Sequence, residues 1–279
     1  MRADQFIVAA GLAPTRSAAQ RLIERGAVQW ASPKGWVPLK KAGEALPDHA
    51  ELRITDNAEL RYVSRGGLKL EGALRASGLD VSGLIALDIG QSTGGFTDCL
   101  LKAGAAAVVG VDVGHGQLHP NLQADARVSA LEGTHVRELD TSALQTLAPA
   151  GGFALIVGDL SFISMIGALP HLDRWLSAQG QVLLLIKPQF ELGPQAIGKG
   201  GLVKDPSLYP ALAEQAHAAA IALGWTVRGW FDSAIAGGDG NREFFLWASR
   251  PDVAAAPPAS AASRRSASAP ISPDAKDAT

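Results

Sequence analysis

The sequence predicts an α/β fold in which an open, mainly parallel sheet follows a small N-terminal α+β module. From residue 63 onward, apolar runs alternate with helical patterns, which is typical of a parallel sheet. Residues 1–62 instead show two helical patterns and short alternating strands, so we expect a separate domain there. Residues 251–279 are mostly Ala, Ser and Pro. This composition predicts a disordered tail because it buries too little apolar surface to fold.

The overall composition is that of a globular protein. The chain has 279 residues, of which 47% are hydrophobic and 19% charged, and its formal net charge is −2. This length is sufficient for one large domain and one small domain. Cys99 is the only cysteine, so no disulfide can form within the chain, as expected for a cytoplasmic protein. No apolar run approaches the roughly 18–20 residues that cross a bilayer, so we expect no membrane-spanning segment.

The N-terminal module is expected to begin with two helices. The first is predicted at residues 3–10. The second is predicted to start at Ser17, because Ser17-Ala-Ala-Gln20 has the spacing of a capping box, and to stop at Gly26. Short strands are expected at residues 27–30 and 51–55.

Positive charge is concentrated in the same module. Residues 1–41 contain seven Lys or Arg but only two Asp or Glu, which indicates a localised anionic partner. Arg21 and Arg25 lie one turn apart on the second predicted helix, so both guanidinium groups could face one phosphate backbone. A solvated basic helix face is the competing interpretation of the same charges.

Polar residues stand at the ends of the predicted strands of the large domain. Asp88, Asp112, Asp159 and Lys187 each close an apolar run, and Glu243 opens the last run. Ligands bind at the carboxyl edge of parallel strands in open α/β sheets, and a final antiparallel strand brings its first residue to that edge. The sequence therefore predicts a carboxylate-rich cleft with one lysine. Between the strands we expect helices at residues 96–103, 163–178 and 208–223, and a final hairpin of residues 226–231 and 243–248.

A glycine-rich turn follows the first of these strands. Residues 88–95 read Asp-Ile-Gly-Gln-Ser-Thr-Gly-Gly, which lacks the spacing of both the dinucleotide fingerprint and the P-loop. Asp112, at the end of the second strand, stands where an acid can bind ribose hydroxyls. Together these features favour a nucleoside cofactor without a phosphate, of which S-adenosylmethionine is the commonest. The competing interpretation is a turn kept only for tight packing between strand and helix.

Two other chemistries compete for this region. Gly90-Gln-Ser-Thr-Gly94 also matches the nucleophile elbow G-x-S-x-G, in which Ser92 would attack an ester. The histidines argue against such a serine hydrolase, because none follows a late strand. His115 and His119 are four residues apart, but no third ligand has suitable spacing, so no metal site is expected.

The remaining strand-end residues suit the activation of a hydroxyl group beside a sulfonium methyl donor. These residues are Asp159, Lys187 and Glu243, and Lys69 is a candidate fourth member. A second cation nearby and partial burial favour loss of a proton from a lysine, which can then act as a base. Residues 159–162 lack the Asn/Asp-Pro-Pro-Tyr pattern expected for methylation of a base amine, so a ribose hydroxyl is the better candidate. A surface salt bridge is the competing interpretation for Lys69 and Glu243.

Five sequence motifs, in order, resemble the TlyA family of bacterial ribosomal RNA 2′-O-methyltransferases, which are also named hemolysin A. They lie at residues 64–71, 90–98, 111–118, 159–164 and 186–191. The resemblance implies an RNA-binding module of the ribosomal-protein-S-four type at residues 1–62. It also implies a Rossmann-like, FtsJ-like domain that uses S-adenosylmethionine at residues 63–250. The expected reaction is methylation of a cytidine ribose 2′-hydroxyl in the RNA of one or both ribosomal subunits.

The resemblance also implies roles for individual residues. The family's catalytic Lys-Asp-Lys-Glu tetrad corresponds to Lys69, Asp159, Lys187 and Glu243. The expected cofactor-binding residues are Asp88, Gly90, Ser92, Thr93, Gly94, Gly95, Phe96 and Asp112. The expected RNA-binding residues are Arg16, Arg21, Arg25, Lys40, Lys41 and Arg65. Gln91 replaces a usually small residue, so we expect a changed approach of the glycine loop to the cofactor. The hemolysin name raises membrane lysis as an alternative, but the sequence has no spanning segment and no strongly amphipathic cationic helix.

Overall fold

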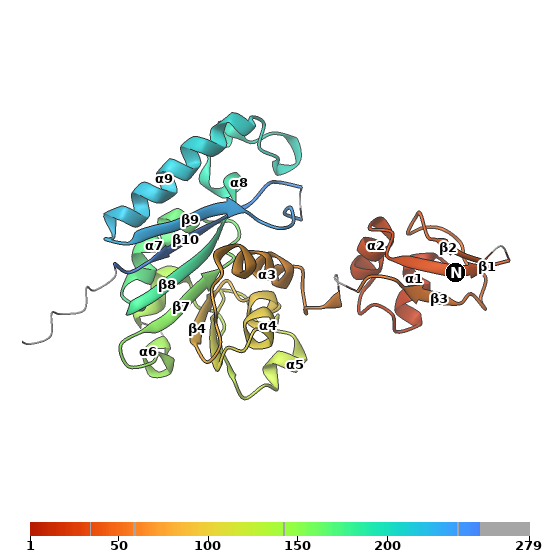
Figure 1. The fold of residues 1–279 in the computed structure, drawn as a ribbon, viewed down its shortest axis with the longest axis horizontal. Coiled ribbons are helices and arrows are strands. Elements are labelled where there is room, and N and C mark those ends of the chain that lie inside the picture. Colours follow the sequence, from red (N-terminus) through yellow and green to blue (C-terminus); the bar gives the residue numbers. More distant parts are fainter. Residues whose placement is uncertain (34, 58–59, 142, 239, 252–279) are drawn as a thin grey trace, which may run out of the picture.

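The computed structural model describes residues 1–251 except 34, 58–59, 142 and 239. From residue 252 on, the predicted tail lies outside this part. Two folded bodies are visible in Figure 1, a small N-terminal one and a larger one built around a long twisted sheet. Within the described part, the small body holds a three-stranded sheet and the large body a seven-stranded sheet. The predicted α/β class with a small α+β module is therefore confirmed.

The small body packs two helices and an antiparallel sheet around one apolar core. Thr15 caps the second helix, because its side chain accepts a hydrogen bond from the Ala18 amide. The predicted cap at Ser17 is therefore wrong by two residues. The sheet order is β2-β1-β3. Strand β2, at one edge of this sheet, was not predicted. The elements are α1 (Ala3–Ala9), α2 (Arg16–Glu24), β1 (Val28–Ser32), β2 (Gly35–Pro38) and β3 (Leu52–Ile54).

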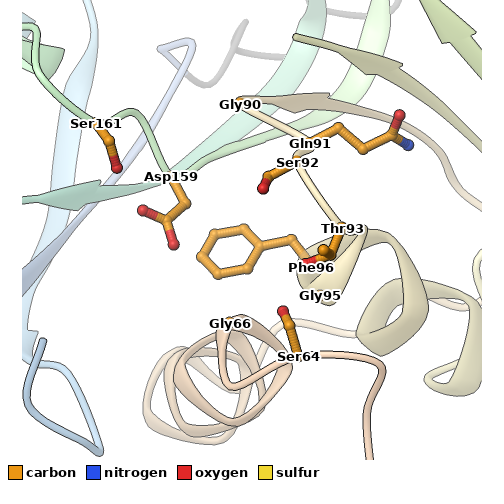
Figure 2. A pocket seen from close by; sticks show the side chains of 10 residues that line it. All are labelled: Ser64, Gly66, Gly90, Gln91, Ser92, Thr93, Gly95, Phe96, Asp159 and Ser161. Atoms are coloured by element: carbon orange, nitrogen blue, oxygen red, sulfur yellow. The ribbon is translucent and has the colours of Figure 1, made fainter. Parts of the chain in front are cut away.

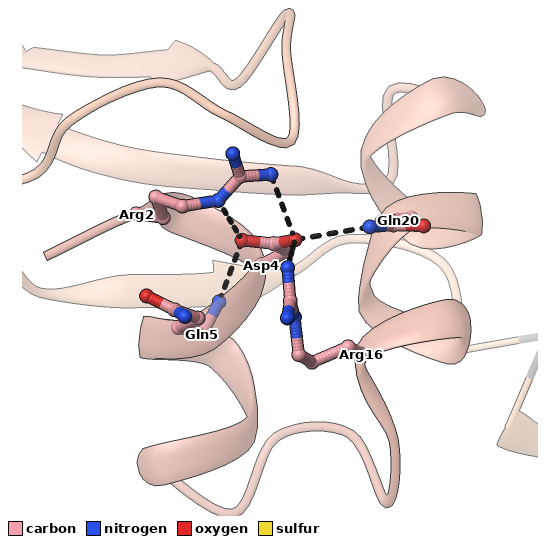
Figure 3. A network of polar contacts seen from close by, with 5 residues as sticks. All are labelled: Arg2, Asp4, Gln5, Arg16 and Gln20. Carbon is pink, nitrogen blue, oxygen red and sulfur yellow. Dashed lines mark hydrogen bonds and ion pairs between the residues drawn. The ribbon is translucent and has the colours of Figure 1, made fainter.

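A buried carboxylate holds the two helices of this body together (Figure 3). Asp4 lies inside the protein and accepts hydrogen bonds from Arg2, Arg16 and Gln20 at 3.0–3.1 Å and from the Gln5 amide at 3.0 Å. The hydrogen bonds from Arg2 and Gln20 are the main reason why the pKa of Asp4 lies well below its usual range. Arg16 thus has a structural partner, although its side chain stays about half exposed.

The strand order of the large sheet is β6-β5-β4-β7-β8-β10-β9 over the described residues. The strands β4 to β8 run parallel to one another, and β10 runs antiparallel to both β8 and β9. The final hairpin is therefore as predicted. The strands are β4 (Ile85–Ile89), β5 (Ala107–Val111), β6 (Val128–Leu131), β7 (Phe153–Gly158), β8 (Leu176–Ile186), β9 (Thr226–Asp232) and β10 (Phe244–Ser249).

Helices cover both faces of this sheet (Figure 1). Alternate residues of a strand face opposite sides, so Ala86 packs into one core with α3, α4 and α5, whereas Leu87 and Ile89 pack into another with α6, α7 and α9. The helices are α3 (Gly66–Ser77), α4 (Gly95–Lys102), α5 (Pro120–Gln123), α6 (Leu144–Leu147), α7 (Met165–Asp173), α8 (Pro188–Glu191) and α9 (Tyr209–Ala222). The 3₁₀ helices are η2 (Val136–Thr141), η3 (Pro194–Ala196), η4 (Lys199–Gly201) and η5 (Pro206–Leu208).

The helix predicted at residues 163–178 is too long. It ends at Asp173, and β8 begins at Leu176. The Phe153 amide donates to the Trp175 carbonyl at 2.7 Å, and Leu176 pairs with Phe153 on β7. Pairing with a neighbouring strand therefore overrides the helical spacing of the apolar residues. In the described part of the chain, every helix is too short or too polar to cross a lipid bilayer.

We predict that Asp4→Asn destabilises the small body. The Asn side chain has an NH₂ group in place of one carboxylate oxygen. At the position of Oδ2, this group cannot accept the hydrogen bonds that Arg2, Arg16 and Gln20 donate, so these bonds are lost. Hydrogen exchange followed by mass spectrometry should show several-fold faster exchange in α1 and α2, with the large body unchanged. Because the pKa of Asp4 is lowered in the folded state, its contribution is present at neutral pH and is lost in strong acid.

Asp48→Asn is the matched control, since the Asp48 side chain is almost fully exposed and its ion pair with the N-terminal amino group is long, at 3.9 Å. Equal exchange in the two variants would contradict the structural role of Asp4.

Candidate active site

The sheet topology brings the predicted strand-end residues to one edge. Asp112, Asp159 and Lys187 directly follow β5, β7 and β8. Glu243 directly precedes β10, and its neighbour Phe244 pairs with Ile186 on β8. The antiparallel direction of β10 therefore places Glu243 beside Lys187, as the sequence predicted.

Two lysines and two carboxylates form a connected cluster at this edge. Lys187 Nζ lies 2.7 Å from Asp159 Oδ1, and Lys69 Nζ lies 2.6 Å from Glu243 Oε2 and 3.9 Å from Asp159 Oδ2. Both lysines and Glu243 are buried, and Asp159 is partly exposed. The pair of Lys69 and Glu243 is thus a buried ion pair, so its interpretation as a surface salt bridge is wrong. Burial raises the pKa of Glu243, and Lys69 opposes this shift.

Helix α3 supplies Lys69 because its first turn packs tightly on the glycine turn. A Cβ atom on Gly95 would lie 2.2 Å from Ser64 Oγ and 3.0 Å from the Gly67 amide. Only a glycine lets the start of α4 approach the start of α3 this closely. The Ser64-Arg-Gly-Gly67 segment and the glycine turn therefore fix each other, and Lys69 follows two residues later.

The glycine turn leaves open space beside Asp159 (Figure 2). Gly90 has a φ of +82°, and a Cβ atom there would lie 2.6 Å from the Asp159 carbonyl oxygen. A small cavity of about 140 Å³ lies between this turn, Asp159 and the start of α3, and Figure 2 shows the residues that line it. Of the predicted cofactor residues, Gly90, Ser92, Thr93, Gly95 and Phe96 line it. Gly94 (φ +92°) forms the turn itself and packs against Leu122.

A larger cavity of about 470 Å³ continues past the ends of β4 and β5. It shares Gly90, Ser92 and Asp159 with the smaller one and also contains Asp112. Its size falls within the range of about 300–1,000 Å³ that is usual for small-molecule sites. The Asp112 carboxylate accepts hydrogen bonds from the Ser92 amide at 2.8 Å and the Gly114 amide at 2.7 Å. These two bonds fix the carboxylate and leave it further lone pairs for a ligand's hydroxyl groups.

Asp88 and Gln91 lie behind the glycine turn. Thr97 Oγ1 donates to Asp88 Oδ2 at 2.7 Å and accepts from Gln91 Nε2 at 2.9 Å. Complete burial raises the pKa of Asp88 to about 7. In Figure 2 the Gln91 side chain points away from Asp159, and it occupies the space that a Cβ atom on Gly110 would need. Both side chains thus support the turn from within the protein.

Two residues near the cluster could not be foreseen from the strand ends. Ser161 Oγ accepts a hydrogen bond from Lys187 Nζ at 2.7 Å. Phe162 is 85% exposed, has a φ of +67° and lies 5.4 Å from the Phe190 ring, measured between ring centroids. The sequence contains no signal for either residue, because their positions beside the cluster depend on the tertiary fold.

The predicted RNA-binding residues divide into three groups. Arg21 of α2 and Arg25, which directly follows α2, line a cleft of about 330 Å³ together with Arg65, which precedes α3. Lys40 and Lys41 are exposed after β2. Arg16 belongs to the Asp4 network. The structure thus brings three of the six residues to one place between the two bodies.

The geometry does not favour a serine hydrolase. Ser92 Oγ donates to Gln117 Oε1 at 3.1 Å. Among the described residues, no histidine forms a hydrogen bond with Ser92. Over the same residues, no group of three His, Cys, Asp or Glu side chains could hold a metal ion.

Comparisons with known proteins agree with this geometry. The FtsJ-like methyltransferase family matches residues 62–250, and the S4 domain matches residues 1–29. The chain is 42% identical over 246 residues to the 16S/23S rRNA (cytidine-2′-O)-methyltransferase TlyA of Mycobacterium tuberculosis, covering 88% of each protein. It is 35% identical over 244 residues to hemolysin A of Brachyspira hyodysenteriae, covering 88% of this chain and 98% of the relative.

A solved structure supports the same relationship. A hemolysin-named protein from Streptococcus thermophilus superposes with a TM-score of 0.67 at 39% identity, covering 90% of this chain and 89% of that protein. The match thus includes both folded bodies rather than the sheet alone. The chain belongs to the TlyA family of FtsJ-like methyltransferases.

Proposed function

We propose that this protein uses S-adenosylmethionine to methylate the ribose 2′-hydroxyl of a cytidine in 16S rRNA, 23S rRNA or both. The observation that carries the proposal is the buried cluster of Lys69, Asp159, Lys187 and Glu243 beside an open cavity. The relative from Mycobacterium tuberculosis is named for this reaction. A ribosomal substrate implies that the protein works in the cytoplasm.

The residues around the larger cavity fit S-adenosylmethionine. Gly90 lets the glycine turn lie close to the Asp159 backbone at the cavity edge, and Asp112 offers a fixed carboxylate for ribose hydroxyls. Val113 is exposed next to Asp112 on the cavity wall and offers apolar contact to a flat base. When bound, this cofactor supplies a methyl group that its sulfonium makes electrophilic. The substrate ribose would then lie beside Asp159, which lines both cavities.

In this proposal Lys187 enters the step as a neutral amine, takes the proton from the 2′-hydroxyl as the oxygen gains the methyl group, and becomes an ammonium group beside Asp159. Asp159 and Ser161 fix the position of Lys187 Nζ through contacts of 2.7 Å each. Before the transfer Lys69 offsets one of the two carboxylate charges of Asp159 and Glu243, and the proton taken up by Lys187 then balances the other. Such balance is needed because an uncompensated buried charge is strongly destabilising.

The small body and the cleft of Arg21, Arg25 and Arg65 are proposed to bind the rRNA. Arginine side chains bind phosphate oxygens through charge-assisted hydrogen bonds. Contacts of this kind position an RNA without selecting its sequence. The cleft lies between α2 and the segment that precedes α3, so RNA held there would be close to the helix that carries Lys69.

Lys187→Ala is expected to lower the rate of methyl transfer by roughly 10²–10⁴-fold, the usual contribution of a general base. Cofactor affinity should change little, because Lys187 does not line the larger cavity. Transfer of a labelled methyl group to isolated ribosomal subunits measures the rate, and titration calorimetry measures the affinity. Arg75→Ala, at an exposed position of α3, is the control. A Lys187→Ala enzyme that turns over as fast as this control would refute the proposed base.

Charge reversal of both Arg21 and Arg25 to Glu is expected to weaken RNA binding. The slope of log K against log salt concentration should become less steep by about one for each phosphate that the protein no longer neutralises. Filter binding of ribosomal subunits over a salt titration measures both effects.

The control for this experiment is the double charge reversal of Arg75 and Arg127, which changes the net charge equally. Both residues lie away from the cleft, on α3 and before β6. If the two double variants bind alike at every salt concentration, the cleft is not the RNA-binding surface.

A further inference from the structure

Two segments, one beginning with Asp159 and the other with Lys187, contact each other at both of their ends. One is residues 159–164, between β7 and α7, and the other is residues 187–191, between β8 and the end of α8. At the first junction Lys187 contacts Asp159 and Ser161. At the second junction the last residue of α8, Glu191, reaches the start of α7.

Glu191 uses both carboxylate oxygens at this second junction. Oε1 accepts hydrogen bonds from the Met165 amide at 2.7 Å and the Ile166 amide at 3.2 Å. Oε2 accepts from Ser164 Oγ at 2.5 Å. The carboxylate thus acts only as an acceptor, and its charge is favourable at the N-terminus of α7. Burial raises the pKa of Glu191, and these hydrogen bonds oppose the shift.

Helix α7 does not depend on Glu191 for its cap. Ser164 already caps it, because the Ser164 hydroxyl oxygen accepts from the Gly167 amide at 2.8 Å. That leaves the Ser164 hydroxyl hydrogen free to donate to Glu191. The carboxylate is therefore an additional link, and it comes from the segment that begins with Lys187.

The segment between the two junctions needs such support. Phe162 has a left-handed φ of +67°, which is unfavourable for a residue with a Cβ and persists only where the surroundings hold it. Its ring is exposed and lies next to Phe190, inside the second segment. Both segments thus present aromatic rings beside the cluster, and their separation is set by the two junctions.

We propose that Glu191 is a positioning residue that fixes the distance between Lys187 and Asp159 and the orientation of Phe162 toward the RNA. Its influence on the reaction rests on the proposed methyl transfer. Its influence on residues 159–166 does not, because that follows from the hydrogen bonds alone. The two parts can therefore be tested separately.

Three variants distinguish positioning from simple stability. Glu191→Ala removes all three hydrogen bonds, whereas Glu191→Gln retains an oxygen acceptor for the two backbone amides. Ser164→Asp keeps a capping oxygen for the Gly167 amide but removes the hydrogen that Ser164 donates to Glu191. Asp173→Ala is the matched control, since Asp173 lies at the other end of α7 and binds Trp225 Nε1 at 2.7 Å and Arg250 at 3.0 Å.

The first measurement is hydrogen exchange of residues 159–166 in the full-length protein without cofactor or RNA. We expect faster exchange in Glu191→Ala, little change in Glu191→Gln and no change in Asp173→Ala. Unchanged exchange in Glu191→Ala overturns the proposed clamp, whatever the enzyme activity. If Glu191→Ala fails to fold, Ser164→Asp takes its place with the same expectation and the same contrary result.

The second measurement is kcat and KM for methyl transfer to ribosomal subunits, at a temperature where every variant is folded. Misplacement of catalytic groups by about 1 Å can lower a rate by about 100-fold, so we expect a kcat loss between about tenfold and 100-fold in Glu191→Ala. Glu191→Gln should recover most of kcat, and Asp173→Ala should keep it. A Glu191→Ala kcat equal to that of Asp173→Ala overturns the positioning role. No transfer by the wild-type protein would instead refute the proposed function and leave the exchange result standing.

Discussion

The buried contact between Lys187 and Asp159 is the constraint on which the active-site edge depends. Both groups follow apolar strands that lie side by side, so they leave the core at the same point. Removing one partner from a buried ion pair leaves an uncompensated charge, which usually costs several kcal/mol. The second pair, Lys69 and Glu243, lies close enough to share Asp159. The four side chains therefore form one electrostatic unit, contributed by four separate parts of the chain.

The surroundings of the cluster serve its geometry in two ways. Glycines allow close backbone approach where the turn after β4 meets the start of α3 and the end of β7. Hydrogen bonds then fix the segments that this approach leaves irregular, as Asp112 does for Ser92 and Glu191 does for the start of α7. Open space beside Asp159 is thus obtained without loose loops around it. That combination suits a reaction in which a sugar hydroxyl must be placed accurately beside a donor.

The positions of the strand ends could be predicted from sequence because buried parallel strands are nearly continuous apolar runs and their first polar residue is conspicuous. Asp159, Lys187 and Glu243 were found this way, whereas Lys69 depended on the resemblance, since a lysine inside a helix has no such marker. Ser161 and Glu191 could not be recognised, because their partners lie 25 or more residues away in sequence. The start of β8 and the partner of Arg16 were missed for the same reason, as tertiary contacts decide both.

The central claim is that this cluster activates a ribose hydroxyl of the RNA and not an atom of a nucleobase. Nucleoside mass spectrometry of rRNA treated with the pure protein and S-adenosylmethionine tests it most directly, because it identifies the atom that receives the methyl group. We predict a gain of 2′-O-methylcytidine that depends on the protein. A methyl group found on a base nitrogen or carbon, with the ribose unmodified, would contradict this claim.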